Sequence, residues 1–325
     1  MARPAIRLHL PAHMLADGGA RMPPFYGRLA GGLRRLGAEV TLEHRDIADL
    51  RAGLRGGDVD LVHAAAIGRP QALTLGVAYL DRFQYLDPDG IFFESSTRRA
   101  RFRPDAVPLA QALRFQELLH AHYVAERRSR HVQPEARAQF PGGHIALFLQ
   151  DLSDPVERAR HMTAAEMVET VLLARDGRPL VVKPHPRNHG PETAAILRRL
   201  AGVPGVEITA ANLHDILSGA ALSVSISSSV GLEGMMQGVP AVFFGATDLH
   251  HNAVTVTRPD DWPEAMARAL RTEWPHAQFL LWFLRRRNLD ARRPFMDRVL
   301  ERIAAVGGDL AALGLPAQLP EGFRA

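Results

Sequence analysis

Lys183, Pro184, His185, Pro186 and Arg187 stand together at the end of a short apolar run. The two prolines prevent the backbone around His185 from continuing a strand or starting a helix, so the sequence predicts a rigid loop after a strand. Lys183 is the only lysine in the chain. A compact ammonium charge, an imidazole and a guanidinium together are suited to binding an anion. The alternative is a proline-stiffened turn with exposed bases.

A second polar group follows the apolar run Leu222–Ile226. Three serines precede a predicted helix: Ser227, Ser228 and Ser229. One serine is enough to cap a helix, so three hydroxyl groups followed by Gly231 predict a phosphate-binding loop at the start of the helix. Glu233, in the first turn of that helix, either stabilises the helix dipole or reaches the diol of a ribose.

Two further candidates are carboxylates. Gln150 and Asp154 follow the apolar run His144–Leu149, where a carboxylate could act as a nucleophile or base. Taken alone, Asp154 also fits a helix cap or a turn. Glu94 lies between an apolar run and an arginine cluster, so it is either a surface acid in a salt bridge or a catalytic acid or base.

The composition excludes several kinds of chemistry. The 325 residues include no cysteine, which rules out disulfides, zinc–thiolate sites, iron–sulfur clusters and cysteine nucleophiles. Asp58 and Asp60 stand where a predicted strand begins and resemble a turn, and His250 and His251 lack a third ligand at helical spacing, so no metal is expected. The remaining chemistry is that of hydroxyl, imidazole, carboxylate and cationic groups.

The chain is basic, with 39 Lys and Arg against 35 Asp and Glu. Its arginine clusters fit solvated faces, an anionic membrane surface or an anionic substrate. No aromatic-interleaved basic motif of the kind that binds nucleic acid accompanies them, which argues against nucleic acid as a partner. The N-terminus has no apolar core of the length of a signal peptide, so we expect a cytoplasmic protein, with peripheral membrane attachment as an option.

Short apolar runs alternate with amphipathic stretches along the chain, which predicts parallel sheets covered by helices. The expected strands are Ala5–Leu10, Ala38–Glu43, Val59–Ala65, His144–Leu149, Pro179–Val182, Val206–Ile208, Leu222–Ile226 and Pro240–Phe244. The expected fold is α/β, with two Rossmann-like domains at residues 1–140 and 141–325. A long helix is expected around Leu109–Arg130 and a linker at His131–Gly143. The helical end of the chain could pack on either domain, and the division above assigns it to the second.

Three motifs resemble those of the bacterial capsule polysaccharide synthesis family, whose characterised members are retaining β-Kdo transferases that use CMP-Kdo. The motifs are Gln150-x-x-x-Asp154, Lys183-Pro-His185-Pro186 and Ser227-Ser228-Ser229-x-Gly231-x-Glu233. The resemblance covers roughly Ala146–Thr257. This chain departs from the family pattern in GLEGMM after the serines and in GATDLHH, where the family usually has a tyrosine.

The resemblance implies a GT-B fold with two Rossmann-like domains facing a central cleft, and a donor held mainly by the second domain. It places CMP at His185 and Pro186, and the phosphate at the serines. It makes Asp154 the carboxylate at the anomeric carbon, positioned by Gln150. The implied partners are a CMP-activated sugar and a glycan or lipid-linked acceptor, with no cofactor and no metal.

Other functions fit the same motifs. A UDP-sugar 2-epimerase or a CDP-alcohol phosphotransferase would also use two Rossmann-like domains. A non-catalytic subunit that binds a nucleotide or a glycan would carry the binding residues without turnover.

Overall fold

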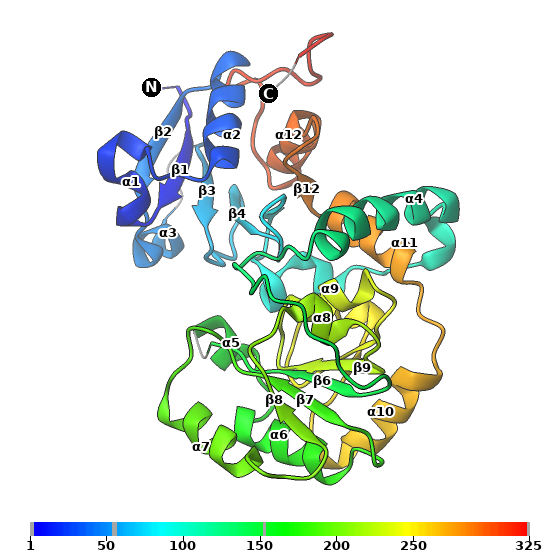
Figure 1. The fold of residues 1–325 in the computed structure, drawn as a ribbon. Coiled ribbons are helices and arrows are strands. Elements are labelled where there is room, and N and C mark those ends of the chain that lie inside the picture. Colours follow the sequence, from blue (N-terminus) through cyan, green and yellow to red (C-terminus); the bar gives the residue numbers. More distant parts are fainter. Residues whose placement is uncertain (1–2, 54–56, 152–153, 324–325) are drawn as a thin grey trace. The chain divides into compact units, whose positions relative to one another are not determined.

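The computed structural model describes residues 3–53, 57–151 and 154–323, and the chain divides into two compact units (Figure 1). The first unit contains Met1–Ala100 and Leu284–Ala325, and the second contains Arg101–Phe283. Each unit is built on a six-stranded sheet. The expectation of two Rossmann-like domains is therefore confirmed.

The sheet of the second unit is parallel throughout, in the order β11-β10-β9-β6-β7-β8. Its strands are β6 (Ile145–Phe148), β7 (Leu180–Lys183), β8 (Val206–Ile208), β9 (Leu222–Ser225), β10 (Ala241–Phe243) and β11 (Val254–Thr255). The chain starts at the centre with β6, builds outward to β8, then returns to place β9 on the other side of β6. This is the strand order of dinucleotide-binding Rossmann domains, and the order reverses between β6 and β9.

Helices cover both faces of this sheet, which explains why its central strand β6 is a continuous, buried apolar run. Ile145 and Leu147 of β6 pack into one core with α6 and α10, whereas Ala146 and Phe148 pack into another with α8. The helices of the second unit are α4 (Leu109–Leu119), α5 (Asp154–Ala159), α6 (Ala164–Leu173), α7 (Pro191–Leu200), α8 (Leu213–Leu217), α9 (Val230–Met235), α10 (Trp262–Arg271) and α11 (His276–Leu281).

The sheet of the first unit has the order β12-β5-β4-β3-β1-β2. Its strands are β1 (Ile6–Leu10), β2 (Val40–His44), β3 (Val59–His63), β4 (Ala72–Val77), β5 (Phe83–Asp87) and β12 (Leu289–Asp290). The four strands β1 to β4 are parallel, while β5 and β12 each run antiparallel to their neighbour. The helices are α1 (Ala12–Gly19), α2 (Pro24–Arg35), α3 (Ile47–Ala52) and α12 (Met296–Ala305).

Shorter helical turns complete the two units. The 3₁₀ turns are Phe92–Glu94, Ser96–Arg99, Pro104–Ala106, His250–Asn252 and Pro259–Asp261. Two π-helical turns, His120–Ala125 and Trp282–Arg287, continue α4 and α11. The long helix expected around Leu109–Arg130 is therefore shorter, because α4 ends at Leu119 and the π-helical turn at Ala125. Among the described residues, no helix is both long and apolar enough to cross a membrane.

The predicted division at residue 140 differs from the two units and is corrected here. Residues 284–325 return to the first unit, where β12 pairs with β5 and Arg82 forms a bidentate ion pair with Asp290 at 2.8 and 2.6 Å. Residues 101–140 belong to the second unit, where the side chain of Gln116 on α4 donates to the carbonyl of Met235. Both placements depend on long-range contacts that local sequence patterns do not specify.

Candidate nucleotide-sugar site

The three motifs predicted from the sequence follow three neighbouring strands of the second unit. The serines come after β9, Gln150 after β6, and His185 after β7, and these strands are adjacent in the sheet. Parallel strands end at the same edge, so the structure brings the three loops together. Because the strand order reverses between β6 and β9, this edge is the place where open α/β sheets bind ligands.

Gln150 connects all three loops. Its Oε1 accepts a hydrogen bond from the backbone N–H of Ser227 at 2.7 Å, which joins the loop after β6 to the loop after β9. Its backbone carbonyl accepts from the side-chain amide of Asn188 at 2.8 Å, which joins the loop after β7. Gln150 therefore holds the geometry of the edge through direct contacts. Its role in positioning Asp154 or the sugar, which the family resemblance implies, stays a prediction.

The two predicted catalytic carboxylates lie in different units. Asp154 begins α5, four residues after Gln150 in the sequence, but its side chain lies outside the described residues. Glu94 lies in the first unit, in the 3₁₀ turn Phe92–Glu94. Both roles therefore stay predictions.

The only lysine has a structural partner. Lys183 Nζ donates to the backbone carbonyl of Ala210 at 2.9 Å and also to that of Ala211. Burial lowers the pKa of Lys183 below its ordinary value. A compact ammonium group reaches two adjacent carbonyl groups here, whereas a planar guanidinium would need a different arrangement of donors. This contact gives a physical reason for lysine at position 183 without assigning it to the ligand.

His185, between Pro184 and Pro186, is half-buried in the loop after β7. Its Nδ1 accepts from the backbone N–H of Arg187 at 3.3 Å, so a neutral ring carries its proton on Nε2. Burial and, second, the cation of Arg187 lower the pKa of His185. Arg187 also forms an ion pair with Asp151 at 3.4 Å, and both side chains are largely exposed. Such an exposed pair contributes little to stability and leaves Arg187 able to exchange partners.

The serine loop differs in detail from the predicted phosphate cradle. The N–H of Ser227 donates to Gln150, that of Ser228 donates to Ser225 Oγ, and that of Val230 donates to Ser228 Oγ. These amide groups therefore already have acceptors within the protein. Helix α9 also has only six residues, which limits its dipole. A phosphate at this loop would depend more on hydroxyl groups than on a row of amides.

Gly231 has a packing role. A Cβ atom at this position would lie 2.4 Å from Cζ of Phe243 and 3.2 Å from Cβ of Ala241, both on β10. No side chain fits between α9 and β10 at such distances, so glycine permits the close approach of the helix to the sheet. The structure therefore gives Gly231 a packing role, and its predicted part in nucleotide binding stays a prediction.

Glu233 is completely buried. Its Oε1 accepts from Ser129 Oγ at 3.1 Å and from Ser229 Oγ at 3.4 Å, while Oε2 lies 3.6 Å from His214 Nε2. Among the described residues, Oε2 has no hydrogen-bond partner. Burial raises the pKa of Glu233 to about 8, although the two serine hydroxyls act in the opposite direction. The carboxyl group faces protein atoms, so a contact with ribose, as the sequence suggested, would require Ser129 to move.

This environment gives Glu233 a distinct effect on stability as the pH changes. A pKa of about 8 in the folded state against 4.5 in the unfolded state means that unfolding releases a proton between these values. Stability should fall as the pH rises from 4.5 to 8, by on the order of 1 kcal/mol per unit. Glu233→Gln keeps the shape of the side chain but does not titrate. In urea denaturation, the free energy of unfolding of the variant should therefore rise relative to that of wild type between pH 5 and 8. Parallel pH curves for the two proteins would contradict the burial of this carboxyl group.

A segment that the sequence analysis treated as the end of a helix and a linker contacts the site. We call residues 126–138 the strap. Arg127 in the strap donates to both carboxylate oxygens of Asp215, at 2.9 and 2.7 Å, and the rings of His131 and His185 lie 6.0 Å apart. Sequence reasoning therefore missed Ser129 and His131. Their signal was the arginine-rich stretch ERRSRH, which also fits an ordinary solvated face.

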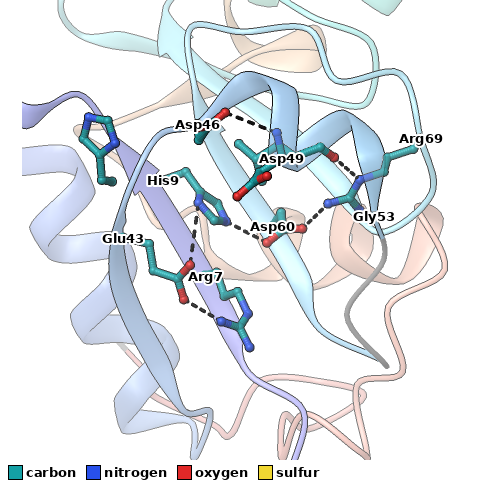
Figure 2. A pocket seen from close by; sticks show the side chains of 10 residues that line it. Arg7, His9, Glu43, Asp46, Asp49, Gly53, Asp60 and Arg69 are labelled. Carbon is teal, nitrogen blue, oxygen red and sulfur yellow. Dashed lines mark hydrogen bonds and ion pairs between the residues drawn. The ribbon is translucent and has the colours of Figure 1, made fainter.

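The first unit contains a small polar pocket between its sheet and α3 (Figure 2). His9 Nε2 lies 2.7 Å from Asp60 Oδ1, Arg69 pairs with the other oxygen of Asp60, and Arg7 donates to Glu43 at 2.6 Å. The cavity volume of about 60 Å³ has room for a few water molecules, far less than a nucleotide needs. Arg7, His9, Glu43, Asp60 and Arg69 pair with one another or with Asp58, so we interpret the cluster as a structural ion network.

Two Rossmann-like units in one chain define the GT-B type of fold, to which many glycosyltransferases belong. No family model and no curated protein match this chain. Two solved structures share its fold at low sequence identity. The KpsC β-Kdo 2,4 transferase of Thermosulfurimonas dismutans is 18% identical, with a TM-score of 0.54 over 85% of this chain and 89% of that chain.

The second solved structure is the KpsC β-Kdo 2,7 transferase of the same organism. It is 16% identical, with a TM-score of 0.52 over 78% of this chain and 84% of that chain. At these identities the similarity establishes the fold. It covers both units, so the likeness extends beyond one Rossmann-like domain.

Proposed function

We propose that this protein is a retaining glycosyltransferase that moves Kdo from CMP-Kdo to a glycan or lipid-linked acceptor in the synthesis of a surface polysaccharide. The observation that carries the proposal is the assembly of three motifs at one sheet edge, with Gln150 bonded to the loops after β7 and β9. Two β-Kdo transferases share the fold, which supports this choice among nucleotide-sugar enzymes.

The proposed donor site uses residues of all three loops. His185 and Pro186 would contact CMP, with Arg187 beside them, and the hydroxyl groups of Ser227, Ser228 and Ser229 would hold its phosphate. Lys183, Gly231 and Glu233 would act indirectly, because their contacts with protein atoms hold the loops in place. A CMP leaving group carries one phosphate, so imidazole and hydroxyl donors can stabilise its charge without a metal ion.

The proposed chemistry has two displacements. A carboxylate oxygen of Asp154 forms a bond to the anomeric carbon as the bond from that carbon to the phosphate oxygen breaks, and CMP leaves with the electron pair. An acceptor hydroxyl then attacks the same carbon, its proton passes to a base, and the carboxylate of Asp154 is released. Two inversions give net retention. Glu94 is the candidate acid or base from the first unit.

Nucleotide binding provides the first test. The protein should be stabilised selectively by CMP in a thermal-shift panel with UMP, UDP and CDP, by about 2.7 kcal/mol at a hundredfold excess over Kd. His185→Ala should weaken CMP binding about tenfold or more, because a hydrogen bond to a charged group contributes about 1.5–3 kcal/mol. His13→Ala, an exposed histidine of the first unit, is the matched control.

The panel also separates the alternatives. Selective stabilisation by UDP would contradict the proposal and favour a UDP-sugar 2-epimerase. Binding of CMP with neither transfer nor hydrolysis of CMP-Kdo would favour a non-catalytic subunit. A cytoplasmic protein attached to an anionic membrane is the location we propose, and failure to sediment with anionic vesicles would remove the membrane from the proposal.

A further inference from the structure

The strap is fixed by side chains rather than by regular structure. The guanidinium of Arg127 holds Asp215 in a bidentate pair, and both side chains are largely buried, at 15% and 11% exposure. The amide of Asn212 donates to the carbonyls of Arg127 and Pro134, and Gln133 Oε1 accepts from the N–H of Leu213. Both ends of the strap are thus tied to the start of α8, and its central residues need little further ordering to bind a ligand.

The centre of the strap lies against the proposed donor site. Ser129 donates to Glu233 on α9, which connects the strap to the helix of the serine loop. The ring of His131 lies 6.0 Å from the ring of His185, at an interplanar angle of 88°. These contacts place an imidazole from a different part of the chain beside the imidazole that the motif supplies.

The charges around the two imidazoles favour an anion. The groups that act on His185 are Arg187, Asp151, His131 and Lys183, of which only Asp151 is acidic. Arg187, His131 and Lys183 all lower the pKa of His185, although burial has the largest effect. An anionic group beside His185 would reverse this repulsion. The imidazoles of His131 and His185 are close enough for one phosphate or carboxylate group to accept hydrogen bonds from both.

We propose that His131 is a further donor-binding residue, which together with His185 holds an anionic group of the sugar nucleotide. This inference rests on the proposed function and adds a fourth element, the strap, to the three loops. The anionic group is either the phosphate of CMP or the carboxylate of Kdo, since both present oxygen acceptors to imidazole donors.

Calorimetric titration with CMP, cytidine and free Kdo tests the proposal. CMP carries only the phosphate, Kdo only the carboxylate, and cytidine neither. His131→Ala should weaken the binding of CMP or of Kdo about tenfold, and the affected ligand identifies the group. Cytidine should bind wild type and variant equally. Val132→Ala, whose side chain is 98% exposed in the same strap, should leave all affinities unchanged.

A double-mutant cycle with His185→Ala separates a shared ligand from two independent contacts, because residues that bind one group give non-additive losses. Equal affinity of His131→Ala and wild type for both CMP and Kdo would overturn the assignment of His131. In that case a loss of CMP binding in His185→Ala would leave the proposed function standing. If wild-type protein binds neither CMP nor Kdo, the proposed function fails, and the role of His131 fails with it.

Discussion

Asp154→Asn is expected to lower the transfer of Kdo by at least about a thousandfold, while the affinity for CMP stays within about twofold. An amide cannot form the glycosyl ester that the proposed first displacement requires, and loss of a catalytic carboxylate or nucleophile typically costs this much or more. CMP binding should persist because the proposed nucleotide contacts come from the loops after β7 and β9. Transfer from CMP-Kdo and CMP titration measure the two effects separately.

Asp176→Asn makes the same chemical change in an exposed turn of the second unit. Its backbone has a φ of 50°, a conformation that asparagine also adopts, so the control should fold and react as wild type. Intact-protein mass spectrometry after mixing with CMP-Kdo should show one attached sugar on wild type and none on Asp154→Asn. Transfer by Asp154→Asn within tenfold of wild type would exclude the double displacement through this residue.

Asp60→Ala is expected to destabilise the first unit by about 3–5 kcal/mol. Asp60 is buried and accepts from His9 and Arg69, so its removal leaves a buried guanidinium without its carboxylate. Asp49→Ala changes an exposed residue of the same pocket and should cost less than about 0.5 kcal/mol. Urea denaturation followed by far-ultraviolet circular dichroism measures both.

The positions of the tryptophans and the pKa of Asp60 make the result of this experiment more specific. The three tryptophans, Trp262, Trp274 and Trp282, all belong to the second unit, so their fluorescence reports that unit and the circular dichroism reports both. Burial raises the pKa of Asp60, but the combined effect of His9 and Arg69 is larger and opposite. The pKa of Asp60 therefore lies below its ordinary 3.8. The stability that Asp60 contributes should therefore be present above pH 3.8 and disappear in stronger acid. A loss of less than 1 kcal/mol at neutral pH would contradict a structural role for the network.

The sequence specified local structure well where one pattern dominated. The strands β6, β8, β9 and β10 lie within the predicted runs, and β7 extends one residue beyond its run, to Lys183. The central strand β6 is buried throughout, and all of its residues are apolar. The strands β4, β5, β11 and β12 were not predicted. The two residues of β12, Leu289 and Asp290, become a strand only because β5 lies beside them.

The candidate site divides in the same way. The sequence placed Gln150, His185 and the three serines at the ends of three strands, and parallel pairing brings these ends to one edge of a sheet. The sequence could not show that the N–H of Ser227 is already bonded to Gln150, or that Glu233 is buried against Ser129. These contacts join residues 77 and 104 positions apart, and no local pattern encodes them.

By itself, then, the sequence determined two Rossmann-like units and the place of the Lys-Pro-His-Pro loop after a strand, while the binding of an anion by this loop stays a prediction. Tertiary structure decided which unit the C-terminal residues join, how the strap reaches His185, and why position 183 is lysine. The physical reason is the range of the interactions. Strand and loop character depends on neighbours a few residues away, whereas the ammonium of Lys183 depends on carbonyl groups 27 and 28 residues further along the chain.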